Sequence, residues 1–319
     1  MRYTTLGKSG LTVSPIAFGT WQLSGEWGGY TEDEAVRAIN AALESGINFF
    51  DTAQAYGFGE AERMLGKALR GENRDELVIA TKGGLRPDGN PRDSSREWLR
   101  KGVHQSLDAL GIDVIDLYQV HWPDPATPFA ETAETLRELI DEGKIRHVGV
   151  SNFDEREMAA FAEHLPLESL QPPYHLFNRD VEDGILSYAQ ESGIGVLVYG
   201  PLAHGMLTGS FSTETTFDES DWRCSHPAFH GKAFDDNLAI VDTLREIATD
   251  CGATLSQLAI AWTLANPAVD VAIVGSRRAE HVVDSVGAAE LELDADTIAY
   301  LRDTAGRGTH IDVLTPESE

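Results

Sequence analysis

The chain has 319 residues, only two cysteines, and a formal net charge of −27 at pH 7, from 25 Lys and Arg against 52 Asp and Glu. Nucleic acids and anionic membrane surfaces attract positively charged proteins, so this charge argues against both as partners. No apolar run could span a bilayer, the first residues lack a signal-peptide pattern, and a core of this size needs no disulfide framework. We therefore expect a cytoplasmic protein.

The chain is expected to begin with a β-hairpin. Residues 3–13 contain two short strand patterns around the turn sequence GKSG, and such a hairpin could plug one end of a barrel. Eight buried-strand patterns follow, each short and rich in β-branched or aromatic residues. The expected strands are Ile16–Gly19, Asn48–Phe50, Leu77–Ala80, Ile115–Val120, His147–Val150, Leu170–Gln171, Gly195–Val198 and Val271–Val274.

Amphipathic helix patterns separate these strands. Several of them begin with a capping residue, such as Thr31, which is followed by Glu34 in a capping box. The expected helices are Thr31–Ser45, Gly59–Leu69, Ser94–Leu110, Phe129–Glu142, Glu155–His164, Val181–Ser192, Asp236–Cys251, Leu255–Ala265 and Ala279–Ala288.

Eight parallel strands joined by helices with right-handed crossovers can close on themselves. We therefore predict an α/β fold, a (β/α)8 TIM barrel with an N-terminal β-hairpin plug and a C-terminal helix. No linker-like stretch divides the chain, so a single domain is expected over residues 1–319. An open doubly wound sheet should carry a dinucleotide-binding glycine motif, but the nearest match, GFGEAE at 57–62, has Glu62 in place of the third glycine.

Four residues that can hold or move a proton follow successive apolar runs. Asp51 and Tyr56 come after the second expected strand, Lys82 after the third and His121 after the fourth. Each alone has a structural explanation, such as a strand-end lysine or a core histidine. Because the C-terminal ends of barrel strands converge on one face, their shared position predicts an active site.

These four groups suit the reduction of a carbonyl group by hydride. A phenol is a weak acid, with an ordinary pKa of about 10. We expect the Lys82 ammonium to favour the Tyr56 phenolate, while Asp51 keeps the lysine charged. Tyr56 could then donate or accept a proton, and His121 could polarise the same carbonyl oxygen.

The chain resembles the aldo-keto reductase superfamily, in particular its short-loop branch that is similar to potassium-channel β subunits and general-stress proteins. The matching segments occur in order along the chain and coincide with the expected strand ends. They are FGTWQLSG at 18–25, NFFDTAQAYGFGEAERMLGKAL at 48–69, TKGG at 81–84, LYQVHWPDP at 117–125, GKIRHVGVSNF at 143–153, LQPPYHLFNR at 170–179, YGPLAHGMLTG at 199–209 and VGSRRAEHV at 274–282.

The resemblance implies NADP(H)-dependent reduction of an aldehyde or ketone, with Tyr56 as general acid. It implies nicotinamide contacts from Ser151, Asn152, Gln171 and Tyr199. It also implies further cofactor contacts along the pyrophosphate, in the last βα loop beside the adenosine 2′-phosphate, and near the adenine. These residues are Pro201, Leu202, Gly205, Leu207, Gly275, Ser276, Arg277 and Asp284. Arginine suits bidentate phosphate binding, so Arg277 would favour NADPH over NADH.

Some positions depart from the family pattern. Gly200 and His204 stand where Ser and Gln are common, and His175 stands where Asn is common. In the adenine region Asp284 and Ser285 stand where Glu-Asn is frequent. None of these departures affects the four residues at the strand ends.

Three tryptophans, Trp21, Trp27 and Trp122, fall in βα loops and could line an apolar substrate pocket. The spacing of Cys224, His226 and His230 could suit a transition metal, but Pro227 interrupts a regular helix and no second ligand pair lies nearby, so no metal is expected. We interpret residues 210–233 as a mobile polar loop over the pocket.

Two other functions are considered. One is an NADPH-binding regulatory or sensor subunit with little turnover, since the superfamily includes such barrels. The other is an aldolase or isomerase that uses Lys82 as a Schiff base, which would leave the cofactor motifs without a function. The substrate is expected to be a small carbonyl compound, and the oligomeric state stays open.

The acidic residues are spread along every expected helix, and lysine occurs only at positions 8, 67, 82, 101, 144 and 232. A dispersed acidic surface keeps a protein dissolved where salt screens its charges. We take this as a hypothesis of a halophilic protein from a high-salt cytoplasm, the alternative being an ordinary acidic enzyme.

Overall fold

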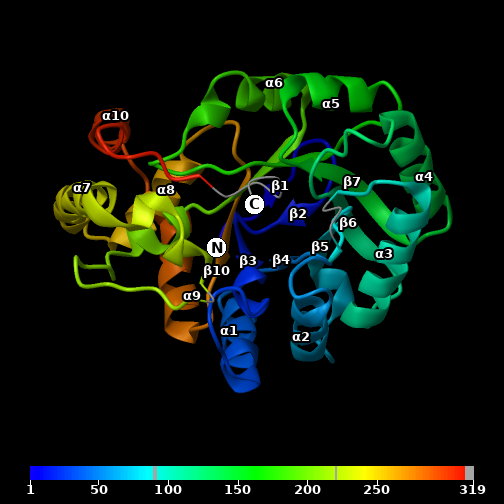
Figure 1. Ribbon diagram of the computed structural model, residues 1–319, viewed down its shortest axis with the longest axis horizontal. Helices are drawn as coiled ribbons and strands as arrows, with labels where there is room; N and C mark the ends of the chain where they lie inside the picture. Colours follow the sequence, from blue (N-terminus) through cyan, green and yellow to red (C-terminus); the bar gives the residue numbers. More distant parts are fainter. Residues whose placement is uncertain (89–91, 220, 313–319) are drawn as a thin grey trace.

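A computed structural model describes residues 1–88, 92–219 and 221–312, and its centre is a closed barrel of eight parallel strands. The order around the barrel is β10-β3-β4-β5-β6-β7-β8-β9, so neighbours in the chain are neighbours in space (Figure 1). The predicted TIM barrel is confirmed. The barrel strands are β3 (Ile16–Gly19), β4 (Phe49–Asp51), β5 (Val78–Gly83), β6 (Ile115–Val120), β7 (Ile145–Ser151), β8 (Ser169–Gln171), β9 (Gly195–Tyr199) and β10 (Val271–Gly275).

The predicted N-terminal hairpin consists of β1 (Thr4–Thr5) and β2 (Thr12–Val13), which pair antiparallel. It plugs the N-terminal end of the barrel, because Leu6 and Val13 are fully buried in the cluster of strand side chains inside it. Gly7 has a φ of 47°, and a Cβ there would lie 2.2 Å from the backbone nitrogen of Gly195 at the start of β9. Only glycine permits this close approach.

Helices surround the barrel (Figure 1). They are α1 (Glu32–Glu44), α2 (Glu60–Ala68), α3 (Arg96–Leu110), α4 (Phe129–Asp141), α5 (Glu155–Ala162), α6 (Ile185–Ser192), α7 (Gly231–Asp250), α8 (Leu255–Leu264), α9 (Ala279–Val286) and the C-terminal helix α10 (Ala295–Ala305). Short 3₁₀ turns lie between them: η1 (Trp21–Leu23), η2 (Arg74–Glu76), η3 (Asp180–Glu182), η4 (Ala203–Thr208), η5 (Trp222–Cys224), η6 (Pro227–Phe229) and η7 (Gly287–Glu290). Among the described residues, no helix combines the length and apolar character needed to cross a membrane.

The expected capping box at Thr31 is present, with the side chains of Thr31 and Glu34 each accepting from the other residue's backbone N–H. Two helix boundaries differ from the prediction. The segment expected as one helix from Val181 to Ser192 is divided into η3 and α6, because Gly184 between them has a φ of 108°, which no helix accommodates. Helix α7 begins at Gly231, five residues before the expected start, so part of the predicted loop is helical.

Two layers of apolar side chains hold the fold together. The inner layer fills the barrel and includes Phe49, Leu117 and Ile273. The outer layer lies between the strands and the helices and contains residues such as Phe18, Leu99 and Ile260, all essentially buried. Strands covered on both faces are apolar throughout, as parallel barrel strands are. A polar side chain on such a strand therefore stands out, and Asp51 and Lys82 are two of them.

Candidate active site

A cavity of about 590 Å³ opens at the C-terminal ends of the barrel strands. Asp51, Tyr56 and His121 line it, and Lys82 lies directly behind them with 1% of its surface exposed. The structure thus brings the four strand-end residues together. Asp51 ends β4, Lys82 lies near the end of β5 and His121 follows β6, and these three strands are neighbours in the barrel.

Lys82 is the centre of this group. Its Nζ donates to Asp51 Oδ1 over 2.6 Å, to the Thr52 carbonyl over 3.0 Å and to the Tyr56 hydroxyl over 3.3 Å. The rings of Tyr56 and His121 meet edge to face, with centroids 5.8 Å apart. A carbonyl oxygen placed between the phenol and the imidazole would therefore meet both side chains.

The protonation state of Tyr56 differs from the sequence-based expectation. Burial, followed by the charges of Asp51 and Glu26, raises the pKa of the Tyr56 phenol well above its ordinary value. The expectation that Lys82 lowers the pKa of Tyr56 is therefore wrong for this structure, while the role of Tyr56 as a general acid stays a prediction. The Lys82 ammonium does not reverse the shift, because Asp51 neutralises much of its field at 2.6 Å while burial penalises the charged phenolate. Tyr56 consequently keeps its proton at neutral pH, as a general acid must.

Burial also affects the other two bases. It lowers the pKa of Lys82, while the charge and hydrogen bond of Asp51 act in the opposite direction. It lowers the pKa of His121 well below the ordinary value, and the Lys82 charge adds to this effect. His121 is therefore neutral in the physiological range, and it can donate a hydrogen bond without carrying a charge.

A second set of polar residues surrounds Asp51. Its Oδ2 accepts from Gln171 Nε2 over 2.9 Å, and Gln119 Nε2 lies at the longer distance of 3.5 Å. Glu62, on the far side of Lys82, accepts from Thr81 Oγ1 over 2.7 Å, and burial raises its pKa. Sequence reasoning missed Gln119 and Glu62. A polar residue inside an apolar strand or helix face was the available signal for both.

The four residues expected at the nicotinamide all line the cavity and are connected to one another. Ser151 Oγ donates to the Gln171 carbonyl over 2.8 Å, and the Tyr199 hydroxyl donates to Asn152 Oδ1 over 2.8 Å. Asn152 Nδ2 donates to the His121 carbonyl over 3.0 Å. Asn152 has a φ of 61°, a conformation that asparagine tolerates better than most residues. It thereby ties together the ends of β6, β7 and β9.

Pro201, Leu202 and Gly205, predicted along the pyrophosphate, line the same cavity, whereas Leu207 is buried in the core and is not part of the lining. The backbone turns sharply here, with φ of 55° at His204 and 100° at Gly205. Gly200 and His204, two positions that depart from the family pattern, lie next to each other in space. A Cβ at Gly200 would lie 3.3 Å from His204 Cε1, so the glycine leaves room for the imidazole.

In the last βα loop, Gly275, Ser276 and Arg277 line the cavity. Arg277 Nη1 donates to the carbonyls of Gly28 over 3.2 Å and Gly29 over 2.8 Å. Asp284 lies farther along α9, outside the lining, and accepts from Thr254 Oγ1 over 2.9 Å. The predicted adenine contact of Asp284 therefore lacks a cavity-facing position in this structure.

Trp21, Trp27 and Trp122 all line the cavity, as expected. Trp21 stacks on Tyr56, with centroids 6.2 Å apart and an interplanar angle of 21°. The lining residues that were not predicted as site residues include Glu26, His204 and Arg223. Glu26 follows Ser24 and Trp21 closely in the sequence, but nothing in that spacing indicates which way its side chain points.

The segment over the pocket is less polar than predicted. Within residues 210–219 and 221–233 the phenyl rings of Phe211, Phe217 and Phe229 pack on one another, with centroids 5.4 to 6.4 Å apart. Arg223 projects from this segment, forms an ion pair with Asp221 and stacks over Trp27 at 4.7 Å.

The Cys224 region shows no convergence of ligands. His226 faces Asp312 over 3.2 Å and His230 faces the Arg223 carbonyl over 3.2 Å. In the described part of the chain, no three His, Cys, Asp or Glu side chains are grouped so that they could hold a metal ion.

Comparison with known proteins identifies the family. The model of the aldo/keto reductase family matches residues 15–305. The chain belongs to the aldo/keto reductase family. Among curated relatives, the aldo-keto reductase YhdN of Bacillus subtilis (strain 168) is 43% identical over 283 residues, covering 87% of this chain and 86% of the relative. The 6-dehydroglucose reductase of Novosphingobium aromaticivorans is 36% identical and covers 90% of each chain.

Solved structures and channel subunits agree with this assignment. A glycerol dehydrogenase from Gluconobacter oxydans superposes with a TM-score of 0.86 at 37% identity, over 99% of this chain and 97% of that one. A probable voltage-gated potassium channel subunit beta of Arabidopsis thaliana is 35% identical over 91% of this chain and 92% of the relative. The chain is thus an oxidoreductase of carbonyl and CH–OH groups, in a family that uses nicotinamide cofactors.

Proposed function

We propose that the protein reduces aldehydes or ketones to alcohols with NADPH, and that Tyr56 is the general acid. The observation that carries the proposal is the contact between Lys82 Nζ and the Tyr56 hydroxyl, 3.3 Å, at the wall of the cavity. Around it, a protonated phenol, a neutral imidazole and a buried ion pair meet at one place. Those are the groups that carbonyl reduction needs.

The lining is suited to a dinucleotide. Amide and hydroxyl groups of Ser151, Asn152 and Gln171 converge at one end, and the Tyr199 ring provides a flat surface beside them. Gly205 has a φ of 100°, and a Cβ there would lie 2.8 Å from the Phe211 ring, so this turn of the lining requires glycine. When bound, the cofactor supplies the hydride.

The remaining steps belong to the protein's own residues. Tyr56 donates its proton to the carbonyl oxygen, and Lys82, already within reach of the hydroxyl, stabilises the resulting phenolate. Asp51 keeps Lys82 charged and fixed through its 2.6 Å contact. His121 is neutral and donates a hydrogen bond that orients the carbonyl. Trp21 and Trp122, which line the cavity, exclude water from the reacting carbonyl.

The substitution Tyr56→Phe tests the general acid. It removes one hydroxyl, keeps the ring that stacks on Trp21, and should lower turnover of 4-nitrobenzaldehyde by about 100-fold or more. Binding of NADPH, followed by quenching of tryptophan fluorescence, should change little. Unchanged turnover would overturn the assignment of Tyr56, and lost NADPH binding would show that the variant is not a clean test.

The preference for NADPH rests on Arg277 and the neighbouring Ser276. A guanidinium binds a phosphate in a bidentate geometry, which NADH does not offer. In the variant Arg277→Ala we expect the affinity for NADPH to fall about tenfold, with a smaller change for NADH, which serves as the internal control. Equal losses for both cofactors would contradict a contact with the 2′-phosphate.

A regulatory subunit is the second candidate, because several relatives carry the name of a potassium channel β subunit. Such a protein should hold NADPH tightly and oxidise it very slowly with any aldehyde. A multiple-turnover assay with 4-nitrobenzaldehyde and methylglyoxal separates the two functions.

Trapping with borohydride tests the remaining alternative, an aldolase or isomerase with a Schiff base on Lys82, whose ammonium is held by Asp51.

A cytoplasm of high salt concentration is the environment we propose for this chain. The support is compositional, a net charge of −27 with carboxylates dispersed over the surface helices. Exposed acidic side chains such as Glu32, Glu97 and Glu191 lie on different helices, so the charge is not one local patch. Salt would screen their repulsion.

A further inference from the structure

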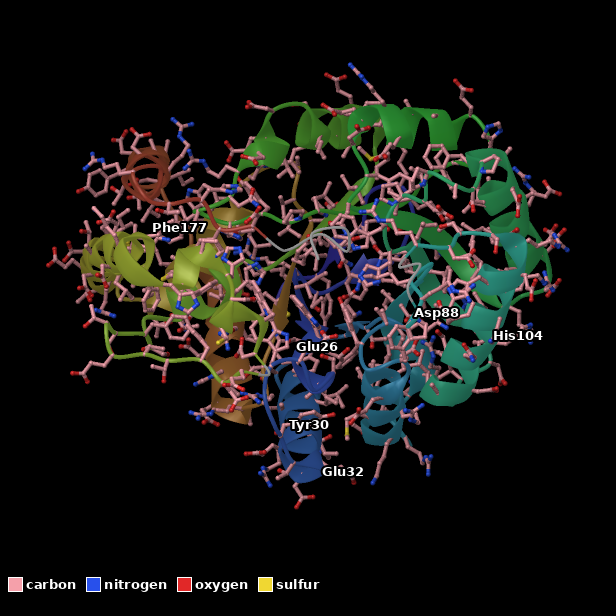
Figure 2. All side chains as sticks on the ribbon, in the orientation of Figure 1. Glu26, Tyr30, Glu32, Asp88, His104 and Phe177 are labelled. Carbon is pink, nitrogen blue, oxygen red and sulfur yellow. The ribbon has the colours of Figure 1, made fainter. Side chains whose placement is uncertain are left out.

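Glu26 lies in the wall of the active-site cavity, in the loop between β3 and α1. Figure 2 shows Glu26 towards the centre of the molecule, whereas Glu32, the first residue of α1, lies at the lower, outer edge of the view. Glu26 is close enough to Tyr56 for its charge to raise the pKa of the phenol. A carboxylate therefore faces the same space as the proposed acid.

Its side chain is held in place. The indole Nε1 of Trp21 donates to Glu26 Oε2 over 2.5 Å, and Ser24 Oγ donates to the same oxygen over 3.2 Å. The backbone N–H of Glu26 donates to Ser24 Oγ over 3.2 Å. Because Trp21 also stacks on Tyr56, the carboxylate is fixed relative to the reacting group.

Two other charged side chains of the lining are held in ion pairs. Asp51 is paired with Lys82, and Arg223 is paired with Asp221 through two contacts. His121 and His204 are neutral, because burial lowers the pKa of both.

The remaining basic residues of the lining, Arg277, Arg278 and His281, belong to the loop and helix after β10. Arg277 is the one proposed to meet the cofactor phosphate. No salt bridge to Glu26 is present in residues 1–88, 92–219 and 221–312, so its charge is the uncompensated one near Tyr56.

We propose that Glu26 selects carbonyl substrates by charge, so that cationic compounds are favoured over neutral ones and anionic compounds such as keto acids are rejected. This inference rests on the proposed carbonyl reduction. Trp21 holds the carboxylate rather than the substrate, because its indole N–H donates to Glu26 while Tyr56 and Trp222 stack on its ring.

The expected size of the effect of Glu26 on substrate selection follows from electrostatics. Two unit charges a few ångströms apart interact more strongly near a protein surface than in bulk water, so roughly a tenfold effect on kcat/KM is expected for each charged substrate. The effect should appear mostly in KM, since the charge acts on the bound substrate before and during proton transfer alike. It should weaken in high salt, because Glu26 is exposed at the rim of the cavity.

The test uses two matched pairs of benzaldehydes at low ionic strength. One pair is 4-carboxybenzaldehyde and its neutral analogue 4-formylbenzamide. The other is 4-formyl-N,N,N-trimethylanilinium and 4-tert-butylbenzaldehyde. In the unchanged protein we expect the anion to be about tenfold worse than its analogue and the cation better than its analogue. In Glu26→Gln both ratios should move towards one, mainly through KM.

Two control variants distinguish an effect of the Glu26 charge on substrate selection from an effect of the substitution on the structure. Glu26→Asp keeps the charge and should retain most of the discrimination. Glu44→Gln removes one exposed carboxylate at the far end of α1, so it changes the net charge equally and should leave the ratios unchanged. Discrimination that is the same in Glu26→Gln and in the unchanged protein overturns the inference, as does an equal change in Glu44→Gln.

Failure of the inference and failure of the proposed function look different. If neutral benzaldehydes are reduced but the charge ratios do not depend on Glu26, carbonyl reduction stands and charge selection by Glu26 is wrong. If no benzaldehyde of either pair is reduced with NADPH, the proposed function itself fails for this substrate class and the inference falls with it.

Discussion

Gln171 Nε2 donates a hydrogen bond to Asp51 Oδ2 over 2.9 Å, and the two side chains reach this contact inside the barrel from opposite strands. The two residues end strands β8 and β4, which lie opposite each other in the closed order of eight. Asp51 thus accepts from Lys82 with one oxygen and from Gln171 with the other. A residue proposed to bind the nicotinamide is therefore also connected to the ion pair behind Tyr56.

Replacing Gln171 by Leu should affect cofactor binding and turnover together. The variant loses one donor to Asp51, which typically costs about 1 to 3 kcal/mol when the partner is buried. We expect weaker NADPH binding by fluorescence titration and a lower kcat. Gln119→Leu is the matched control, because its contact to the same oxygen is 3.5 Å and its loss should be small. Equal effects of the two variants would contradict this ranking.

Breaking the buried ion pair from one side should be worse than removing it entirely. Lys82→Met leaves Asp51 charged and buried without its cation, and we expect a loss of about 3 to 5 kcal/mol in the free energy of unfolding. The double variant Asp51→Asn with Lys82→Met should recover most of this stability but no activity. Urea denaturation measures the stabilities, and a double variant as unstable as Lys82→Met would be contrary evidence.

The rates of carbonyl reduction and of alcohol oxidation should depend differently on pH. Burial, Asp51 and Glu26 all raise the pKa of Tyr56. Reduction uses the protonated phenol, so its rate should stay level as pH rises through the neutral range and fall only near the raised pKa. Oxidation of the alcohol uses the phenolate, so it should rise over about pH 6 to 10. Initial rates in both directions check this, and a reduction rate that falls already near pH 7 would contradict it.

Acid should destabilise the protein through its buried histidines. Burial lowers the pKa of His204 to about 3, from an ordinary value of 6.5. Between these values the unfolded chain binds a proton that the folded state does not, so stability falls as pH decreases and levels off below the lower value.

The variant His204→Gln should therefore lose less stability on acidification, by at most about 1.4 kcal/mol for each pH unit. His104→Gln, at an exposed position on α3 (Figure 2), is the control and should behave like the unchanged protein. Thermal melting between pH 7 and about 4 measures both. Identical slopes for all three proteins would show that His204 does not control acid stability.

Salt should raise both stability and activity if the acidic surface reflects a high-salt cytoplasm. We expect thermal stability and turnover to increase from low salt to about 2 M KCl, because screening reduces repulsion among the carboxylates. The same series should reduce the charge selection attributed to Glu26. A protein that is most active without salt refutes the high-salt hypothesis.

The barrel and the four central residues were predictable because they follow local rules. Short apolar runs set the strands, and β4 and β5 pair with Asp51 opposite Ala80, which brings Lys82 to the same end of the barrel. The contact between Gln171 and Asp51 was not predictable, since it exists only when the barrel closes and residues 120 positions apart meet.

The pocket rim was harder to predict for a related reason. Glu26 and Arg223 lie in irregular segments, and Arg223 lies 196 positions after Trp27, the residue whose ring it covers. No local periodicity encodes such a contact. The direction of the Tyr56 pKa shift was not predictable from the sequence, because desolvation outweighs the nearby ammonium and burial becomes known only from the folded structure.

The two hydrogen bonds from Arg277 to the carbonyls of Gly28 and Gly29 join the last βα loop to the first. A phosphate that recruits this guanidinium competes with both carbonyls, and these belong to the segment that carries Glu26 and Trp27. A cofactor phosphate bound by Arg277 would therefore release the loop between β3 and α1 from these two hydrogen bonds, and that loop forms the cavity wall next to the proposed substrate position. Since such coupling is reciprocal, a substrate that orders this wall alters the affinity for the dinucleotide by the same factor.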